Sequence, residues 1–185
     1  MKPICIVALA TVMICISGCG PEAKKPTARE AFEATEKLMS AWDKDIKSLR
    51  ADYIRVLISE GADVNASGSA GWTPLMAAAR HSSTPKSVQL LIEKGAELEA
   101  RDNNGWTPLM QAAKLSSTPE IVALLIEKGA EVNARDTDGW TPLLFAAKYS
   151  STPEIVALLL EKGAELEARD TDGWTPLLFS VRNSS

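Results

Sequence analysis

The residues with the clearest potential for chemistry are aspartates that recur in two loops. Asp136-Thr137-Asp138-Gly139 and Asp170-Thr171-Asp172-Gly173 both have the D-x-D-G pattern that begins a calcium-binding loop. An EF-hand also needs a glutamate at its twelfth position, and counting from Asp136 that position is Ala147. We therefore interpret these aspartates as turn formers and predict no metal site.

His81 is the only histidine in the chain. A single histidine without cysteine partners makes neither a zinc site nor a nucleophilic triad by itself. No glycine-rich phosphate loop and no paired-carboxylate cluster stands out in the sequence. We therefore expect no catalytic residue, no cofactor and no enzymatic activity.

All three cysteines lie near the start of the chain, in a segment with the layout of a secretory signal peptide. Lys2 precedes an apolar run from Ile4 to Ile16, which is shorter than the roughly 20 residues that a membrane-spanning helix needs. Ile16-Ser17-Gly18-Cys19 resembles a bacterial lipobox. The resemblance implies a signal peptide over residues 1–18 and acylation of Cys19 by chains such as palmitate. The alternative is an ordinary signal peptide with a cysteine near its cleavage site.

The residues after Cys19 suit a short tether at a membrane surface. Residues 19–27 are polar and contain prolines, and the seven residues from Gly20 to Pro26 reach at most about 25 Å. By the sorting rule of Gram-negative lipoproteins, Gly20 after the cysteine implies the outer membrane. We therefore expect a protein of the bacterial cell envelope, anchored by lipid and facing the periplasm.

The elements that follow are set by an internal repeat of 34 residues, clearest from Gly105 to Asp138. A fixed period of this length is typical of a solenoid, in which each unit contacts mainly its neighbours. Tryptophan and glycine keep the same step along the chain, at Trp72, Trp106, Trp140 and Trp174 and at Gly61, Gly95, Gly129 and Gly163.

Each repeat predicts two short helices and a hairpin-like loop. Thr107-Pro108 opens the first helix, which extends to about Lys114, because threonine caps a free N–H and proline lacks one. Thr118-Pro119 is expected to open the second helix in the same way, with Lys128 in its last turn and its apolar side chains buried between neighbours. Gly129 ends that helix with positive φ, and the polar stretch from Glu131 to Gly139 forms a tight bend.

The strings GWTPLxxAA and LLxEKGAxxxARDxxG resemble the ankyrin repeat over Ala51 to Ser185. This resemblance implies an all-α solenoid of helix-turn-helix units with hairpin-like loops. The sequence departs from the family in its period of 34, where the family usually has 33, because SSTP adds a residue. The family's TPLH histidine is also replaced by apolar residues, so apolar packing is expected there, at Met76, Met110, Leu144 and Leu178.

The two ends of the repeat array differ from its middle. Residues 28–66 are predicted to be an N-terminal capping repeat, beginning with a Thr27–Glu30 capping box. One long helix is compatible with residues 28–60, but we favour two, with a break near Asp43 to Ser48. The predicted cap combines a charged outer face (Arg29, Glu33, Glu36, Lys37, Lys44) with an apolar stripe (Phe32, Met39, Trp42, Ile46, Leu49, Tyr53, Val56).

Residues 67–185 are predicted to be ankyrin repeats, of which the last is incomplete. After the helix from Trp174 to Val181 the sequence stops, and no second helix follows to cover Ile155, Leu158 and Leu159. An open end of this kind is compatible with binding, including self-association into a homo-oligomer, with truncation or with fraying.

Charge and repeat variation bear on the partner. The formal net charge is −4 with mixed signs, which argues against nucleic-acid binding.

The tryptophans are interpreted either as stacking on one another along the solenoid or as an aromatic stripe for a partner. Positions that differ between near-identical repeats, such as Phe145 and Tyr149, are expected to be left free by the fold, and drift at unconstrained sites is the alternative.

Ankyrin proteins generally bind partners through a concave face and hairpin tips, and the variable positions coincide with both. The predicted partner-binding residues are Trp72, Trp106, Gln111, Leu115, Trp140, Phe145, Tyr149, Trp174 and Phe179. We therefore predict a membrane-anchored module that binds an unidentified protein. The alternative is a structural or protective envelope lipoprotein that self-associates.

Overall fold

The computed structural model describes residues 26–44, 51–68, 70–115, 118–150 and 152–183. The predicted signal peptide, Cys19 and most of the tether lie outside these residues. Within them every regular element is a helix, and no helix is both long and apolar enough to cross a membrane. The helices are α2 Ala28–Lys44, α3 Ala51–Ser59, α4 Pro74–His81, α5 Lys86–Glu93, α6 Pro108–Leu115, α7 Pro119–Glu127, α8 Pro142–Tyr149, α9 Pro153–Glu161 and α10 Pro176–Asn183.

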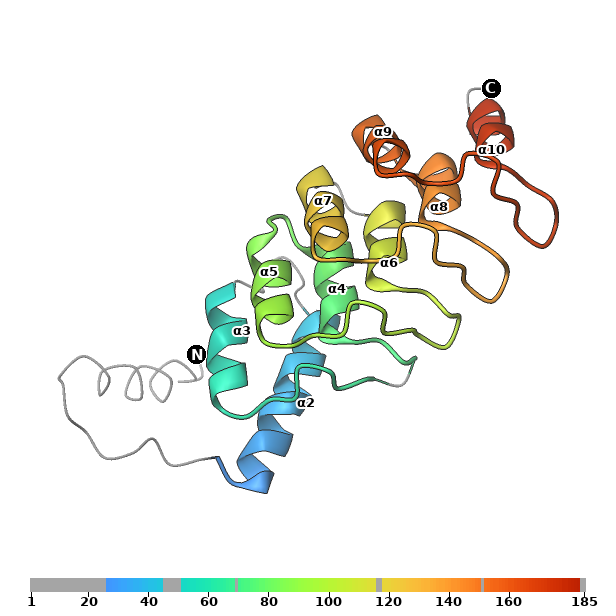
Figure 1. Ribbon diagram of the computed structural model, residues 1–185. Helices are drawn as coiled ribbons and strands as arrows, with labels where there is room; N and C mark the ends of the chain where they lie inside the picture. The colour runs from blue at the N-terminus through green and yellow to red at the C-terminus, as the bar shows by residue number, and fades with distance from the viewer. Residues whose placement is uncertain (1–25, 45–50, 69, 116–117, 151, 184–185) are drawn as a thin grey trace.

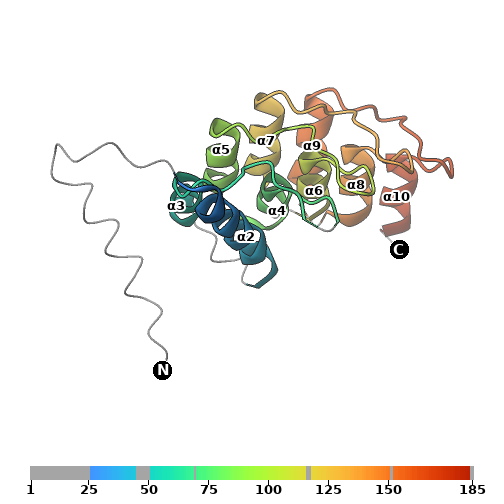
Figure 2. The same cartoon turned by 90° about the horizontal axis from the view of Figure 1, so that it is seen from below.

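The helices from α3 onward form two layers. Figure 2 shows α4, α6, α8 and α10 side by side in one row, which we call the inner helices, and α5, α7 and α9 in a second, outer row. The loops that join each outer helix to the next inner helix project to one side of the stack (Figure 1). This arrangement confirms the predicted solenoid of two-helix units.

The inner helices begin as predicted, whereas the outer helix α7 begins at Pro119 as predicted but lacks the threonine cap. Thr73 and Thr141 precede a proline, and their hydroxyls accept hydrogen bonds from the amides of Met76 (3.3 Å) and Leu144 (3.4 Å). Thr118 also precedes a proline, but its side chain accepts no capping hydrogen bond. The reason is its backbone, with ψ of 94° against 164° at Thr141, and the prediction of an identical cap is therefore wrong.

The outer helices end close to glycines with positive φ, as the sequence predicts. Gly129 has φ of 101°, a conformation that costs glycine little, and the amide of Ala130 donates to the carbonyl of Leu125 at 3.0 Å. Lys128 lies just after the helix, at its C-cap, and not in the last turn as expected.

Adjacent loops are hydrogen-bonded to one another, which fixes their register. Each is closed by a backbone pair such as Asp136 N to Trp140 O (3.0 Å). The amide of Thr137 donates to the carbonyl of Asn104 at 3.2 Å, and the amide of Thr171 donates to the carbonyl of Asp138 at 3.0 Å. The loops therefore form a continuous edge beside the inner helices.

A buried apolar core runs between the two layers, from Ala34 and Leu38 in α2 to Leu159 in α9. A smaller cluster lies between the inner helices and the loops and joins Met110, Ala134 and Phe145 to Trp106 and Trp140. Three of the four apolar residues at the histidine position are fully buried, which confirms apolar packing there: Met76, Met110 and Leu144. Leu178 is the exception, at 49% exposed.

The N-terminal helices cap one end of the stack. The capping box is present: the Thr27 amide donates to Glu30 Oε2 (2.6 Å), and the Glu30 amide donates to Thr27 Oγ1 (3.3 Å). Helix α3 lies one repeat period before residues 85–93, which contain α5, so it is in phase with the outer helices. Two helices are therefore described, although most of the predicted break lies outside the described residues.

The predicted apolar stripe of this cap is partly wrong. Phe32, Tyr53 and Val56 are exposed, at 64%, 44% and 39%. Among the side chains that the structure describes in the two helices of this cap, the buried ones are instead Ala34 and Leu38 in α2 with Ile54 and Leu57 in α3, because these face each other and the first repeat. The predicted stripe residues Met39, Trp42, Ile46 and Leu49 lie outside that description. Among the predicted charged residues, Arg29, Glu33, Glu36 and Lys37 are exposed.

At the other end, the exposed residues are not those predicted. Ile155 and Leu159 are fully buried because α9 packs against α7 and α8, and Leu158 is half-buried. The most exposed apolar side chains of this end lie on α10, where Leu177 is 63% exposed and Val181 62%.

Candidate protein-binding surface

Three of the four repeat tryptophans, Trp106, Trp140 and Trp174, alternate with phenylalanines and do not stack on one another. Phe145 contacts Trp106 at a ring-centroid distance of 4.7 Å and Trp140 at 5.0 Å. Phe179 lies 5.0 Å from both Trp140 and Trp174. We call Trp106, Phe145, Trp140, Phe179 and Trp174 the aromatic row. Each phenylalanine therefore joins the tryptophan of its own repeat to that of the repeat before it, which stabilises the array along its length.

Three predicted partner-binding residues are buried, so the expectation that the fold leaves them free is wrong. Gln111 is 0% exposed, and Phe145 and Phe179 are 3% exposed. They occupy the fourth position of an inner helix, which points into the space between neighbouring inner helices and the loops. Variation at this position reflects different ways of filling that space.

Gln111 occupies the position of these phenylalanines in the repeat before Phe145, and it places a polar group there. Its Nε2 donates to Asp102 Oδ2 at 3.3 Å, while its Oε1 is buried and has no hydrogen-bond partner. In the next repeat Asp136 accepts hydrogen bonds from the amides of Trp140 (2.7 Å) and Asp138 (2.9 Å), and from the Trp106 side chain. Burial raises the pKa of Asp136, and these hydrogen bonds oppose the rise.

These bonds account for the D-x-D-G loops. The Asp136 carboxylate holds the backbone of its own turn, as the turn-former interpretation expects. Among the described residues no group of histidine, cysteine, aspartate or glutamate is arranged to hold a metal ion.

The other predicted residues remain accessible. Leu115 and Tyr149 end their inner helices and are each 44% exposed. The four repeat tryptophans are half-buried, at the junction of loop and inner helix. Loop tips such as Asn104 and Asp138 are exposed. The structure thus brings the exposed members of the predicted set together along the inner helices.

A row of cations that the sequence analysis missed covers the tryptophans. Arg80 lies over Trp72 at 5.1 Å and Arg182 over Trp174 at 5.6 Å. Between them, Lys114 lies 4.2 Å from the centre of the Trp106 ring and 4.7 Å from that of Tyr149, and Lys148 lies 4.6 Å from that of Trp140. We call Arg80, Lys114, Lys148 and Arg182 the cation row. Its signal was present in the sequence, since each cation follows its tryptophan by eight residues.

Two members of the cation row, Arg80 and Lys114, are partly desolvated. Burial is the main cause that lowers the pKa of Lys114; the charges of Arg80 and Lys148 act in the same direction, and Tyr149 opposes them. Burial also lowers the pKa of Arg80, whose Nε is buried without a hydrogen-bond partner. For His81 burial is again the larger cause of a lowered pKa, and Arg80 adds to it.

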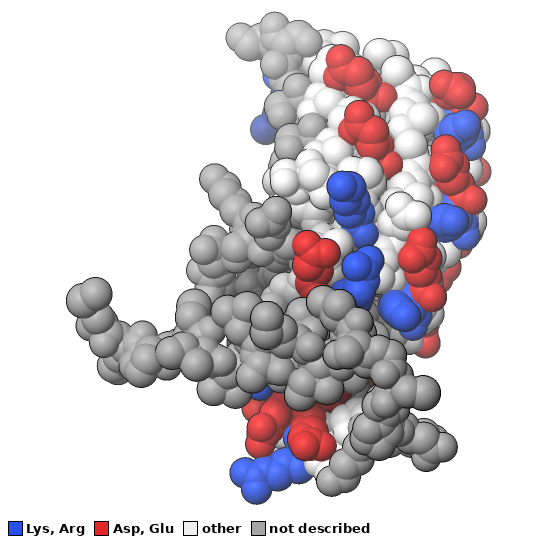
Figure 3. All heavy atoms as spheres, turned by 90° about the vertical axis from the view of Figure 1, so that its left-hand side faces the viewer, with Lys and Arg blue, Asp and Glu red and all other residues white. Residues whose placement is uncertain are grey.

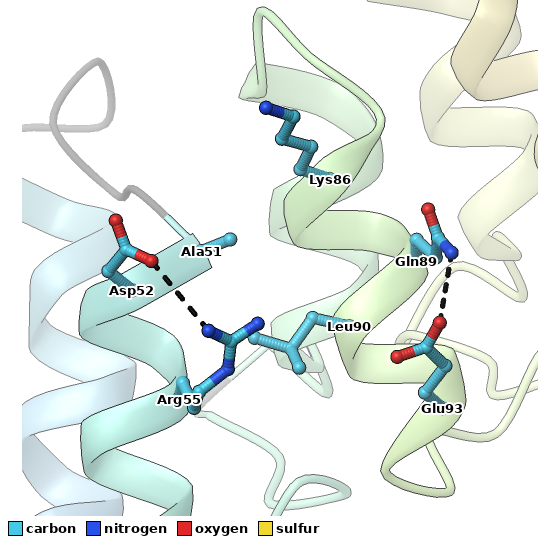
Figure 4. A pocket seen from close by; sticks show the side chains of 7 residues that line it. All are labelled: Ala51, Asp52, Arg55, Lys86, Gln89, Leu90 and Glu93. Carbon is cyan, nitrogen blue, oxygen red and sulfur yellow. Dashed lines mark hydrogen bonds and ion pairs between the residues drawn. The ribbon is translucent and has the colours of Figure 1, made fainter.

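The opposite side of the molecule has a different character. Figure 3, seen from the side on which α5 and α7 lie, shows acidic and basic side chains interspersed. A hollow of about 330 Å³ lies there between α3 and α5, and several charged and polar side chains line it together with Ala51 and Leu90. Figure 4 shows Arg55 directed at Asp52 (3.9 Å) and Gln89 at Glu93 (2.9 Å). This hollow contains none of the predicted partner-binding residues.

Comparison with known families agrees with the geometry. A family model described as ankyrin repeats (3 copies) matches residues 46–136 and 118–185. The comparison with curated proteins finds no match. The matched residues cover both helical layers and the connecting loops, so the chain belongs to the ankyrin-repeat family, whose repeats are protein–protein interaction modules.

Proposed function

We propose that this protein binds a partner protein on the exposed side of its inner helices. We define the inner-helix surface as the cation row together with Leu115 and Tyr149. The observation that carries the proposal is the placement of these two apolar side chains, each 44% exposed, beside the interlocked rings of the aromatic row. A surface held in place by packing loses little conformational entropy when it binds.

The loop edge extends this surface. Exposed tips such as Asn103-Asn104 and Thr137-Asp138 are connected to one another by backbone hydrogen bonds. A partner lying along the inner helices is therefore in a position to contact the loops as well. Nothing in this arrangement requires chemistry on the ligand, and the proposed role is binding.

Capture from envelope extract tests this role, using the full chain in detergent. A Leu115→Ala/Tyr149→Ala variant should lose the captured partner. Leu160→Ala is the matched control, because Leu160 is 39% exposed on the outer helix α9. Equal capture by all three proteins would place binding elsewhere. Phe145 is unsuitable for this test, since its buried ring supports the fold.

We also propose that the chain is lipid-anchored in the bacterial envelope through Cys19, facing the periplasm at the outer membrane. The leader, with its short apolar run and its Ile16-Ser17-Gly18-Cys19 string, supports this. Two or more acyl chains make attachment durable, because each buried CH₂ contributes about 0.8 kcal/mol. Labelled palmitate should be incorporated by the parent chain and by Cys15→Ser, and not by Cys19→Ser. Incorporation by Cys19→Ser would contradict the assignment.

Self-association is a second candidate, favoured by the exposure of α10. Leu177, Leu178 and Val181 are 63%, 49% and 62% exposed, a group of apolar side chains that a second copy would cover. Sedimentation in detergent distinguishes the candidates. A dimer that Leu177→Glu converts to a monomer supports self-association, and a monomeric parent chain excludes it.

A further inference from the structure

The inner helices are positively charged, although the protein as a whole has a negative net charge. The chain has a formal net charge of −4, yet α4, α6, α8 and α10 contain no aspartate or glutamate and hold the four members of the cation row. The outer helices α5, α7 and α9 each contain at least one glutamate. The basic side chains of the inner helices are therefore a local feature that the overall composition does not explain.

Within the described residues, four ion pairs lie outside the inner helices. They join Arg29 to Glu33, Arg55 to Asp52, Arg135 to Glu165 and Lys162 to Glu161. None of these joins Arg80, Lys114 or Arg182 to a carboxylate. The partial desolvation of Arg80 and Lys114 is thus not compensated by an internal acid, and a carboxylate from outside would compensate it.

The aromatic rings hold the cations in place. Lys114 lies within 6 Å of three ring centres (Trp106 4.2 Å, Tyr149 4.7 Å, Phe145 5.8 Å), and Lys148 also contacts three. A cation resting on a ring has fewer accessible rotamers, so it loses less entropy when it pairs with a carboxylate. The repeat period places one such cation in each repeat.

We propose that the inner-helix surface recognises an acidic segment of the partner protein, with its carboxylates on successive members of the cation row. This inference rests on the proposed binding function and names the chemistry of the ligand. Leu115 and Tyr149 follow Lys114 and Lys148 directly in the chain, so the segment combines acidic with apolar residues.

A nucleic acid fits this surface less well. Single strands bind by stacking bases on open aromatic faces, and here the cations already lie over the tryptophan rings. The exposed aspartates of the neighbouring loop tips, Asp138 and Asp172, repel a phosphate backbone. A short acidic segment can lie on the inner helices without following the loop tips.

Selection from a random peptide library tests the inference with the full chain in detergent. Peptides selected by the parent chain should contain aspartate and glutamate at roughly twice or more the library frequency. Lys114→Met/Lys148→Met should lose that enrichment and bind the selected peptides roughly tenfold more weakly, since methionine still packs on the rings without a charge. Lys94→Met/Lys128→Met makes the same change in net charge at exposed lysines beside the outer helices and should keep both properties.

The outcomes separate this inference from the proposed function. Selected peptides without acidic enrichment, or equal weakening in both lysine pairs, would overturn the inference and leave binding intact. Stronger competition by a single-stranded oligonucleotide than by the acidic peptides would also overturn it. The absence of any selected peptide, together with no partner captured from envelope extract, would contradict the proposed function itself.

Discussion

Helices α8 and α10 begin with the same four residues, Pro-Leu-Leu-Phe, and differ sharply in burial. Leu143 and Leu144 are 1% and 0% exposed in α8, whereas Leu177 and Leu178 are 63% and 49% exposed in α10. The phenylalanine that follows is 3% exposed in both helices. The local sequence is the same, so the neighbouring repeat decides which side chains are buried, as expected for a solenoid stabilised by nearest-neighbour interfaces.

The largest expected effect comes from truncating the aromatic row. Phe145→Ala should lower the free energy of unfolding by about 3–5 kcal/mol, because it empties a site between two tryptophans. Tyr149→Ala, one turn further along α8, should lower it by less than about 1 kcal/mol because that ring is 44% exposed. Urea denaturation followed by circular dichroism measures both. Similar losses would mean that the two positions are not distinguished by burial.

The leucines test the comparison of α8 with α10 directly. Leu144→Ala should lower the free energy of unfolding by about 2–5 kcal/mol, and Leu178→Ala by less than about 1 kcal/mol. The same denaturation measurement applies. If Leu178→Ala costs as much as Leu144→Ala, then α10 is covered in solution, and self-association becomes the better account of that end.

A substitution at Gln111 should change the free energy of unfolding less than the truncations of Phe145 and Leu144 do. Gln111→Met removes a buried Oε1 that has no partner, at the expense of one 3.3 Å hydrogen bond to Asp102. We expect the free energy of unfolding to stay within about 1 kcal/mol of the parent value or to rise. A loss as large as that of Phe145→Ala would show that the polar group is required in the second repeat.

The smallest expected effect is a pH-dependent change in stability at His81. The equivalent position in the next repeat is Leu115. Burial, followed by the Arg80 charge, lowers the pKa of His81 below its usual 6.5. As the pH falls, His81 is therefore protonated in the unfolded chain before it is protonated in the folded chain. This difference lowers the free energy of unfolding as the pH falls below about 6.5. The urea midpoints of His81→Leu and of the parent are measured at pH 7.5 and at pH 5. The midpoint of His81→Leu minus that of the parent should be larger at pH 5 than at pH 7.5. A constant difference would contradict the lowered pKa.

The sequence predicted the features that depend on local chemistry. The 34-residue period, the Thr-Pro starts of the inner helices, the positive φ of Gly129 and the Asp136 turn all follow from residues close in the chain. The features missed depend on neighbours. Thr118 has the same sequence signal as Thr141, but its backbone angles differ, and Phe145 is variable among repeats because the space between repeats is filled differently.

The candidate site shows the same division. Comparing repeats identified variable positions, but Phe145 and Tyr149 are both variable and only Tyr149 is exposed, since one faces the loops and the other ends the helix. The cation row recurs with a fixed step and was overlooked because lysine and arginine on a helix usually lie on a solvated face. The contacts of Lys114 and Lys148 with rings of the following repeat are visible only once adjacent repeats are packed together.

Chemical acetylation of lysines, with and without the captured partner, tests the central claim most directly. Lys114 and Lys148 report on the inner-helix surface, while Lys94 and Lys128 report on the outer side of the same molecule. If the partner lies along the inner helices, Lys114 and Lys148 should become several-fold less reactive in the complex, while Lys94 and Lys128 stay unchanged. Protection of Lys94 and Lys128 with Lys114 and Lys148 unaffected would contradict the account.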